Sequence, residues 1–139
     1  MEMSSFKMFM IDVGLLGAKG NIAAKVLLDG CRIFEEFKGA LTEQYVLQEL
    51  SLFPQLNANY YWTSDANAEV DFLFSDGLYA YPLEAKAGNN VHAKSLKVYD
   101  KEYNPQLLFR TSLLPYEKNG KLVNIPLYLL FALPRVLTF

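Results

Sequence analysis

The sequence has one cysteine, one histidine and no long hydrophobic run, and these shortages exclude several classes of protein. The single cysteine, Cys31, excludes an internal disulfide and a cysteine-rich zinc site, and it fits a reducing compartment. The longest apolar stretch, residues 125–134, is well short of the roughly 20 residues that a transmembrane helix needs. Asp12 and Lys19 interrupt the amino-terminal apolar stretch, which argues against a signal peptide. We therefore expect a cytoplasmic protein without a membrane partner.

The chain also lacks a strong net charge and a phosphate-binding loop. Its formal net charge of −2 at pH 7 gives no general attraction to nucleic acid, so any such contact must come from a local patch. The glycines within residues 14–20 do not have the spacing of a phosphate-binding loop that ends in Lys-Ser or Lys-Thr. We therefore do not expect this chain to hydrolyse ATP.

The composition that remains is that of one folded domain. With 139 residues, 52 % of them hydrophobic, the chain is long enough for helices packed on a sheet. Residues 33–53 are predicted as the main helix, which Pro54 ends. The further predicted elements are strands over 59–63, 70–74, 78–87 and 107–110, a helix over 92–103, a surface hairpin or loop over 117–121, and a short helix over 125–133.

The order of these elements predicts the fold class. Two strands joined by a crossover helix in one sheet imply a right-handed, parallel connection. We therefore expect an α/β fold with a mixed four-stranded sheet flanked by helices. At the amino terminus, residues 6–16 fit either a short strand or a turn of helix, and residues 21–28 fit a short helix.

Residues 68–88 predict a β-hairpin with two different faces. A two-residue turn at Asp76-Gly77 would pair Ser75 with Leu78 and place Asp71 opposite Pro82. Because side chains alternate along a strand, Asp71, Glu84 and Lys86 are then expected on one face. Glu69 alternates onto the same face and is expected to be solvated. The opposite, apolar face is predicted to carry Phe72, Phe74, Tyr79, Tyr81 and Leu83.

Two carboxylates and a lysine on one face of a sheet have two interpretations. Mg²⁺ binds a few carboxylate oxygens and leaves its other positions to water and phosphates, and a neighbouring ammonium can orient the water or stabilise developing charge. Alternatively, the three side chains form a solvated surface with a weak ion pair. Spacing alone leaves both interpretations open.

The motif and its surroundings resemble a known family. Asp71 followed by Glu84-Ala85-Lys86 resembles the signature of the PD-(D/E)xK nuclease superfamily, with Val70 in place of its proline. Residues 9–16, 37–43, 68–72 and 82–88 resemble the uncharacterised domain at the C-terminus of a large group of prokaryotic AAA+ ATPases. This resemblance implies a restriction-endonuclease-like αβββαβ core over residues 37–139, with residues 1–36 as an amino-terminal extension packed on it. It also implies that the ATPase module, a partner of this domain, is missing from this chain.

The resemblance further implies a metal site and a function. In the implied site, Asp71 and Glu84 bind Mg²⁺ or Mn²⁺ and Lys86 positions or activates a water. Glu43 stands where the superfamily often has another metal-binding glutamate; the alternative is that it braces a backbone amide. The implied function is a Mg-dependent nuclease-like domain that cleaves or binds nucleic acid, and the alternative is a non-catalytic accessory domain of the ATPase.

Basic residues near this motif are candidates for contact with nucleic-acid phosphates. Lys94, Lys97 and Lys101 recur on one face of the predicted helix 92–103, and Arg110 lies on the strand that follows. Such a stripe binds phosphates or remains a solvated helix face, and the sequence leaves both open.

Overall fold

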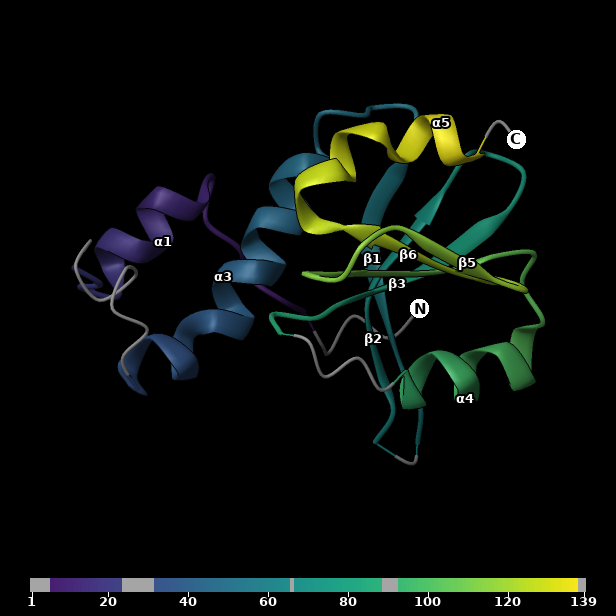
Figure 1. Ribbon diagram of the computed structural model, residues 1–139, viewed down its shortest axis with the longest axis horizontal. Coiled ribbons are helices and arrows are strands. Elements are labelled where there is room, and N and C mark those ends of the chain that lie inside the picture. The colour runs from purple at the N-terminus through teal and green to yellow at the C-terminus, as the bar shows by residue number, and fades with distance from the viewer. Residues whose placement is uncertain (1–5, 24–31, 66, 89–92, 138–139) are drawn as a thin grey trace.

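The computed structural model describes residues 6–23, 32–65, 67–88 and 93–137, and it has one six-stranded mixed sheet with helices packed against it (Figure 1). The helices are α1 (Val13–Lys19), α3 (Arg32–Leu50), α4 (Lys94–Tyr103), the 3₁₀ helix η1 (Leu127–Ala132) and α5 (Leu133–Leu137). The strands are β1 (Asn57–Thr63), β2 (Glu69–Ser75), β3 (Ala80–Ala85), β4 (Leu108–Ser112), β5 (Glu117–Asn119) and β6 (Leu122–Pro126).

The sheet has the order β1-β2-β3-β4-β6-β5. Strands β1, β2 and β3 form an antiparallel meander, and α4 carries the chain from β3 to the parallel strand β4, as predicted. Strand β6 lies parallel to β4, and β5 pairs antiparallel with β6. The predicted count of four strands is therefore wrong, because residues 117–126 form a further hairpin on the sheet. Ile125 and Pro126, predicted to begin the last helix, belong to β6.

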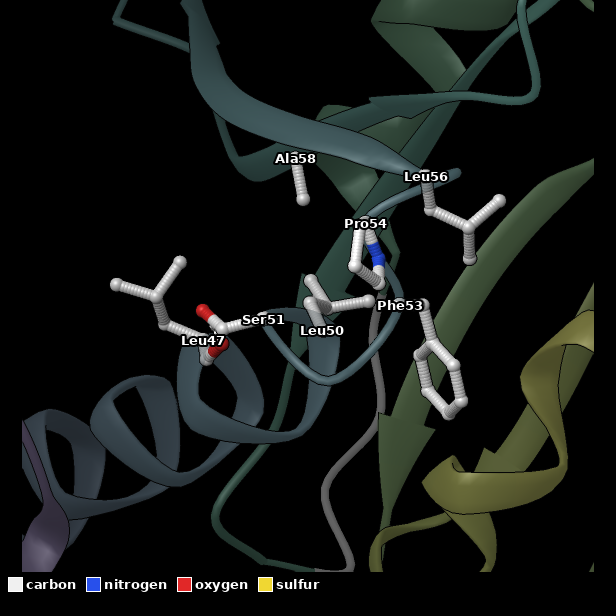
Figure 2. Close-up of a pocket in the computed structure, with 7 residues that line it drawn as sticks. All are labelled: Leu47, Leu50, Ser51, Phe53, Pro54, Leu56 and Ala58. Atoms are coloured by element: carbon white, nitrogen blue, oxygen red, sulfur yellow. Dashed lines mark hydrogen bonds between the residues drawn. The ribbon is translucent and has the colours of Figure 1, made fainter.

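Helix α3 contains most of the predicted helix 33–53, and its carboxyl end borders an apolar pocket. The helix stops at Leu50, four residues before Pro54, and Gly39 lies inside it without ending it. An open cavity of about 390 Å³ follows this end (Figure 2). The cavity is lined by Leu47, Leu50, Ser51, Phe53, Pro54, Leu56 and Ala58, none of which is titratable.

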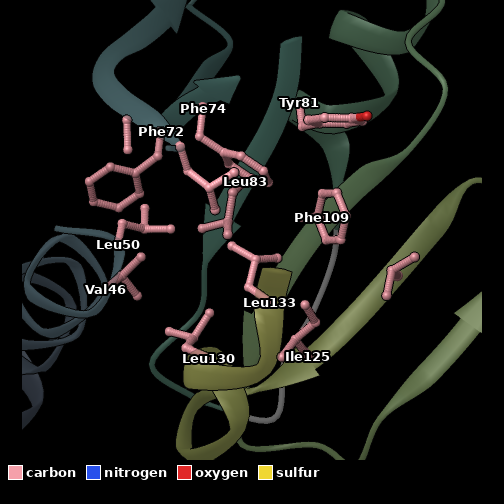
Figure 3. Packing of buried hydrophobic residues seen from close by; sticks show 13 residues of the cluster. Val46, Leu50, Phe72, Phe74, Tyr81, Leu83, Phe109, Ile125, Leu130 and Leu133 are labelled. Atoms are coloured by element: carbon pink, nitrogen blue, oxygen red, sulfur yellow. The ribbon is translucent and has the colours of Figure 1, made fainter. Parts of the chain in front are cut away.

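Two apolar clusters hold the helices on opposite faces of the sheet. Figure 1 shows α4 on the other side of the sheet from η1 and α5. The larger cluster packs α3, η1 and α5 against the sheet (Figure 3) and includes Val46, Leu50, Phe72, Phe74, Leu83, Phe109, Leu130 and Leu133. The smaller cluster packs α4 on the opposite face and includes Val70, Ala93, Leu96 and Tyr99. The start predicted for this helix, His92, lies outside the described residues.

The β2–β3 hairpin has a wider loop than predicted. Ser75 pairs with Ala80 rather than with Leu78, so the register differs by two residues from the predicted one. The side chain of Asp76 explains the width, because it accepts hydrogen bonds from the backbone N–H groups of Leu78 (2.9 Å) and Tyr79 (2.8 Å). A shift of two residues keeps the same faces. The apolar face therefore contains four of its five predicted residues in buried positions, and Tyr79 is exposed.

A hydrogen bond to the same loop should make the stability of the domain decrease at alkaline pH. The Tyr81 hydroxyl donates to Asp76 Oδ2 (3.0 Å), and burial together with this bond raises the pKa of Tyr81 to about 12. In the unfolded chain a tyrosine has a pKa of about 10, so the unfolded state loses its proton first. We expect stability to fall as pH rises from about 10 to 12.

The prediction is that Tyr81→Phe flattens this decrease. The stability difference between wild type and Tyr81→Phe, measured by urea unfolding, should shrink as pH rises from about 10 to 12. Tyr128→Phe, a change at an exposed tyrosine, should leave the decrease in place. A difference for Tyr81→Phe that stays constant over this pH range would contradict the assignment.

An amino-terminal strap, which we define as residues 6–12, runs along α3. The side chain of Gln44, fully buried in α3, accepts from the Met10 N–H (2.7 Å) and donates to the Met10 carbonyl (2.8 Å). Gln48 accepts from the Val13 N–H (3.1 Å) at the start of α1. Residues 6–16 were expected to form either a short strand or a turn of helix. Residues 13–16 are helical, whereas the strap is neither strand nor helix. Most of the helix predicted over 21–28 lies outside the described residues.

The side chains of the strap alternate between the protein and solvent. Lys7 and Phe9 are partly buried, and the ring of Phe9 lies 5.9 Å from that of Phe72. Phe6 and Met8 are 75 % and 85 % exposed. The strap therefore contacts the domain through one side only. None of the helices within the described ranges has both the length and the apolar composition needed to cross a membrane.

Candidate metal site and its surroundings

A β-bulge positions Asp71. From Val70 to Leu73 strand β2 advances three residues, while its partner β1 advances only two, from Trp62 to Tyr60. Val70 and Leu73 accordingly pack in the same cluster against α4, although residues three apart point to opposite faces in an uninterrupted strand. Simple alternation, on which the predicted face of Asp71 depends, is therefore interrupted at this point.

Asp71 is instead fixed by a hydrogen bond to the main chain of β3. The register of β2 with β3 runs from Ser75↔Ala80 to Phe72↔Leu83. Beyond it, the Ala85 N–H donates to Asp71 Oδ2 at 2.7 Å. Ala85 lies between Glu84 and Lys86, so this bond holds the Asp71 carboxylate beside the backbone of the predicted Glu-Ala-Lys motif.

Lys7 of the strap lies among three carboxylates. Its Nζ is 3.4 Å from Glu43 Oε2 and 3.7 Å from Asp71 Oδ1, and it forms a close ion pair with Glu69. It also lies 5.4 Å from the centroid of the Tyr61 ring. Glu43 and Asp71 thus share an ammonium as counter-ion. We call Lys7, Glu43, Glu69 and Asp71 the acidic cluster.

Glu84 and Lys86 form a second pair beside this cluster. Lys86 Nζ lies 2.7 Å from Glu84 Oε1, and the Glu84 side chain is only 5 % exposed. Among the described side chains, the other oxygen, Glu84 Oε2, is one of two buried polar atoms that have no hydrogen-bond partner. A buried carboxylate oxygen without a partner is costly, so this oxygen is a candidate ligand atom.

The surroundings of Glu43, Asp71 and Glu84 disfavour the state in which all three carboxylates are ionised. Burial raises the pKa of Glu43, and the charge of Asp71 raises it further. Burial also raises the pKa of Asp71 and of Glu84, against the opposing effects of the Ala85 N–H and the Lys86 ammonium respectively. Burial alone would lower the pKa of Lys7, but its hydrogen bond to Glu69 and the charges around it raise it overall. An added cation would relieve this repulsion.

The residues present fit a divalent cation only in part. Within the described ranges, no three Asp, Glu, His or Cys side chains are grouped closely enough to hold a metal ion as they stand. Glu43 and Asp71 meet through Lys7, while Glu84 contacts Lys86. The donor set nevertheless suits a hard cation, because it consists of carboxylate oxygens and includes the unpartnered Glu84 Oε2.

The predicted basic residues fall into two groups. Lys94, Lys97 and Lys101 are exposed on α4, so their ammonium groups are accessible. Arg110 is only 7 % exposed, lies opposite Glu84 in the β3–β4 register and donates from Nε to Asn124 Oδ1 at 2.9 Å. Arg110 therefore lies in a buried polar network rather than on an accessible surface.

Sequence reasoning missed Lys7 and Asn124. The available signal for Lys7 is a lysine flanked by apolar residues in the run Phe6–Met10. For Asn124 it is an amide within the apolar strand Leu122–Pro126. Neither signal indicates which residue is contacted, because Lys7 and Asn124 both bind residues far away in the sequence.

Comparisons with known proteins identify the family. Residues 38–130 match the Domain of unknown function (DUF4143), a range that includes Glu43, Asp71, Glu84 and Lys86 but begins after Lys7. No curated protein and no solved structure matched the chain. Because the matched residues make up more than half of the 139, the chain belongs to the DUF4143 family.

Proposed function

We propose that this domain is a metal-dependent, nuclease-like module that binds or cleaves nucleic acid and forms the C-terminal part of an AAA+ ATPase. The proposed ligands of Mg²⁺ or Mn²⁺ are Asp71 and Glu84, with Glu43 as a third carboxylate. The observation that supports it most directly is the buried, unpartnered Glu84 Oε2 on β3, next to the residue whose N–H holds Asp71.

The side chains of the site have separate roles in this proposal. The Ala85 N–H fixes Asp71 Oδ2, so Oδ1, the oxygen that faces Lys7, is the proposed ligand atom. The Lys86 ammonium, 2.7 Å from Glu84 Oε1, favours the ionised form of a carboxylate that burial disfavours. The same ammonium orients a water or stabilises charge that develops on a phosphodiester. When bound, the metal ion would supply polarisation of a phosphoryl oxygen and a more acidic water.

The expected result is that Glu84→Gln weakens Mn²⁺ binding by more than the about 10–100-fold that loss of a hydrogen-bond partner of a metal ligand costs, because the neutral amide offers no anionic ligand. Mn²⁺ titration followed by electron paramagnetic resonance measures this. Lys86→Met should weaken Mn²⁺ binding less than Glu84→Gln does, but it should lower cleavage of single- or double-stranded DNA by about 100-fold, which is within the range for a group that positions a proton.

Glu117→Gln is the matched control, because Glu117 is exposed on β5, far along the sheet from β2. It should change neither Mn²⁺ binding nor cleavage. Mn²⁺ affinity that is the same in wild type and Glu84→Gln would contradict the proposed ligand set. Cleavage that survives Lys86→Met undiminished would reassign the role of this lysine.

The second candidate is a non-catalytic accessory domain of the same ATPase. The acidic cluster favours it, because Lys7 already neutralises part of the charge that a catalytic metal would compensate. In the same assays this domain would bind DNA without cleaving it. Lys97→Ala would then weaken binding and lower the slope of log affinity against log salt by about one.

A further inference from the structure

We propose that Lys7 is a built-in competitor for the divalent cation, so that the strap must leave the acidic cluster before the metal binds. This inference rests on the proposed function, since it concerns the same carboxylates. Its basis is that one ammonium contacts both Glu43 (3.4 Å) and Asp71 (3.7 Å), two of the three proposed metal ligands.

The position of Lys7 Nζ is incompatible with a metal ion at the same oxygens. A divalent ion binds carboxylate oxygens at about 2.0–2.6 Å, closer than Lys7 Nζ approaches Glu43 and Asp71. An ion that bridges these two residues would lie next to the ammonium and repel it. Because the cluster is partly buried, solvent screens this repulsion less than at an open surface.

The strap is held to the domain by few contacts, among them the packing of Phe9 against the larger cluster. It is not a strand of the sheet, and its side chains Phe6 and Met8 are directed to solvent. Its described hydrogen bonds to α3 are those that join Met10 to Gln44, together with the Lys7–Glu43 contact. In contrast, Glu43, Asp71 and Glu84 belong to a helix and strands whose packing does not include Lys7. Detachment would therefore expose Phe9 and free the acids, while α3 and the strands keep their contacts with one another.

Competition of this kind predicts reciprocal effects. If Lys7 lowers the affinity for the metal, the metal must lower the affinity of the strap for α3 by the same factor. Metal binding and strap docking can be measured independently, the first by titration and the second by exchange of the backbone N–H groups of the strap and of the adjoining Val13 that donate to α3.

The first measurement is Mn²⁺ affinity of the 139-residue chain by electron paramagnetic resonance. Lys7→Met removes the ammonium and keeps an apolar side chain of similar length, and we expect it to bind Mn²⁺ at least about tenfold more tightly. The control is Lys118→Met, which removes the same charge from exposed strand β5 and should leave the affinity unchanged.

The second measurement is hydrogen exchange of the Met10 and Val13 N–H groups, which donate to Gln44 and Gln48. In wild type, saturating Mn²⁺ should speed their exchange, because the strap detaches. In Lys7→Met, Mn²⁺ should have no such effect. The experiment uses no activity and therefore does not depend on a nucleic-acid substrate.

The outcomes separate this inference from the proposed function. Tighter binding by Lys7→Met together with faster exchange in wild type supports the competition. Equal Mn²⁺ affinities, or tighter binding without any change in exchange, would overturn it while the metal site itself stands. No Mn²⁺ binding by either wild type or Lys7→Met would overturn the proposed metal site and the inference with it.

Discussion

Asn124→Ala is expected to lower the free energy of unfolding by about 3 kcal/mol, the upper end of the range for leaving buried hydrogen-bonding groups without a partner, because one of these groups is charged. The Asn124 side chain is 1 % exposed and uses both ends of its amide. Its Oδ1 accepts from Arg110 Nε (2.9 Å) and Ser112 Oγ (2.8 Å), and its Nδ2 donates to the carbonyls of Leu114 and Pro115. Alanine would remove the acceptor of the Arg110 and Ser112 donors and the donor to the two carbonyls. One of the groups that lose this partner is the buried guanidinium of Arg110.

Urea unfolding at neutral pH measures this loss. Gln106→Ala is the control, since Gln106 is an exposed amide just before β4, and surface changes of this kind stay within about 0.5 kcal/mol. A loss below about 1 kcal/mol for Asn124→Ala would mean that water replaces the amide without difficulty and that the network is not structural.

Phe109→Ala is expected to have an effect of similar size, about 3–5 kcal/mol, for a different reason. Phe109 lies at the centre of the larger cluster with no exposed surface (Figure 3), and its ring is 5.4 Å from that of Phe74 and 5.8 Å from that of Tyr81. Removing the ring leaves a cavity that the strands on either side, paired to β4, cannot close. The loss combines the transfer free energy of the ring with the free energy of that cavity.

Two further variants make this test specific. Phe109→Leu keeps most of the volume and should lose much less stability. Phe131→Ala removes the same ring from η1, where it is 59 % exposed, and should have little effect. Equal losses for Phe109→Ala and Phe131→Ala would contradict the placement of the core.

Sequence patterns within single segments were enough to predict the main helix, the β2–β3 hairpin and the crossover helix. The main helix forms but ends at Leu50, before Pro54. The hairpin around Asp76-Gly77 forms, and the helix after β3 returns the chain to a parallel strand. The register was wrong by two residues because Asp76 uses its own side chain to widen the loop. The hairpin of β5 and β6 was missed as part of the sheet because Glu117–Asn119 is short, polar and exposed.

The candidate site was predicted less completely, because its geometry depends on contacts that sequence spacing does not encode. No glycine in the sequence indicates the bulge at Asp71. The prediction therefore assumed an uninterrupted strand with strictly alternating side chains. Lys7 and Glu43 are 36 residues apart, and their meeting depends on the strap that Gln44 holds. Glu84 and Lys86 do form an ion pair, as expected for residues two apart along an extended segment.

The position of Lys7 outside the matched range has a practical consequence for protein production. A chain trimmed to residues 38–130 would lose the ammonium that three acids share, as well as the core residue Leu133. The carboxylates left behind would repel one another. Such a truncated protein should purify and stay folded best in mildly acidic buffer or with millimolar divalent salt, a dependence that the 139-residue chain, with Lys7 in place, should not show.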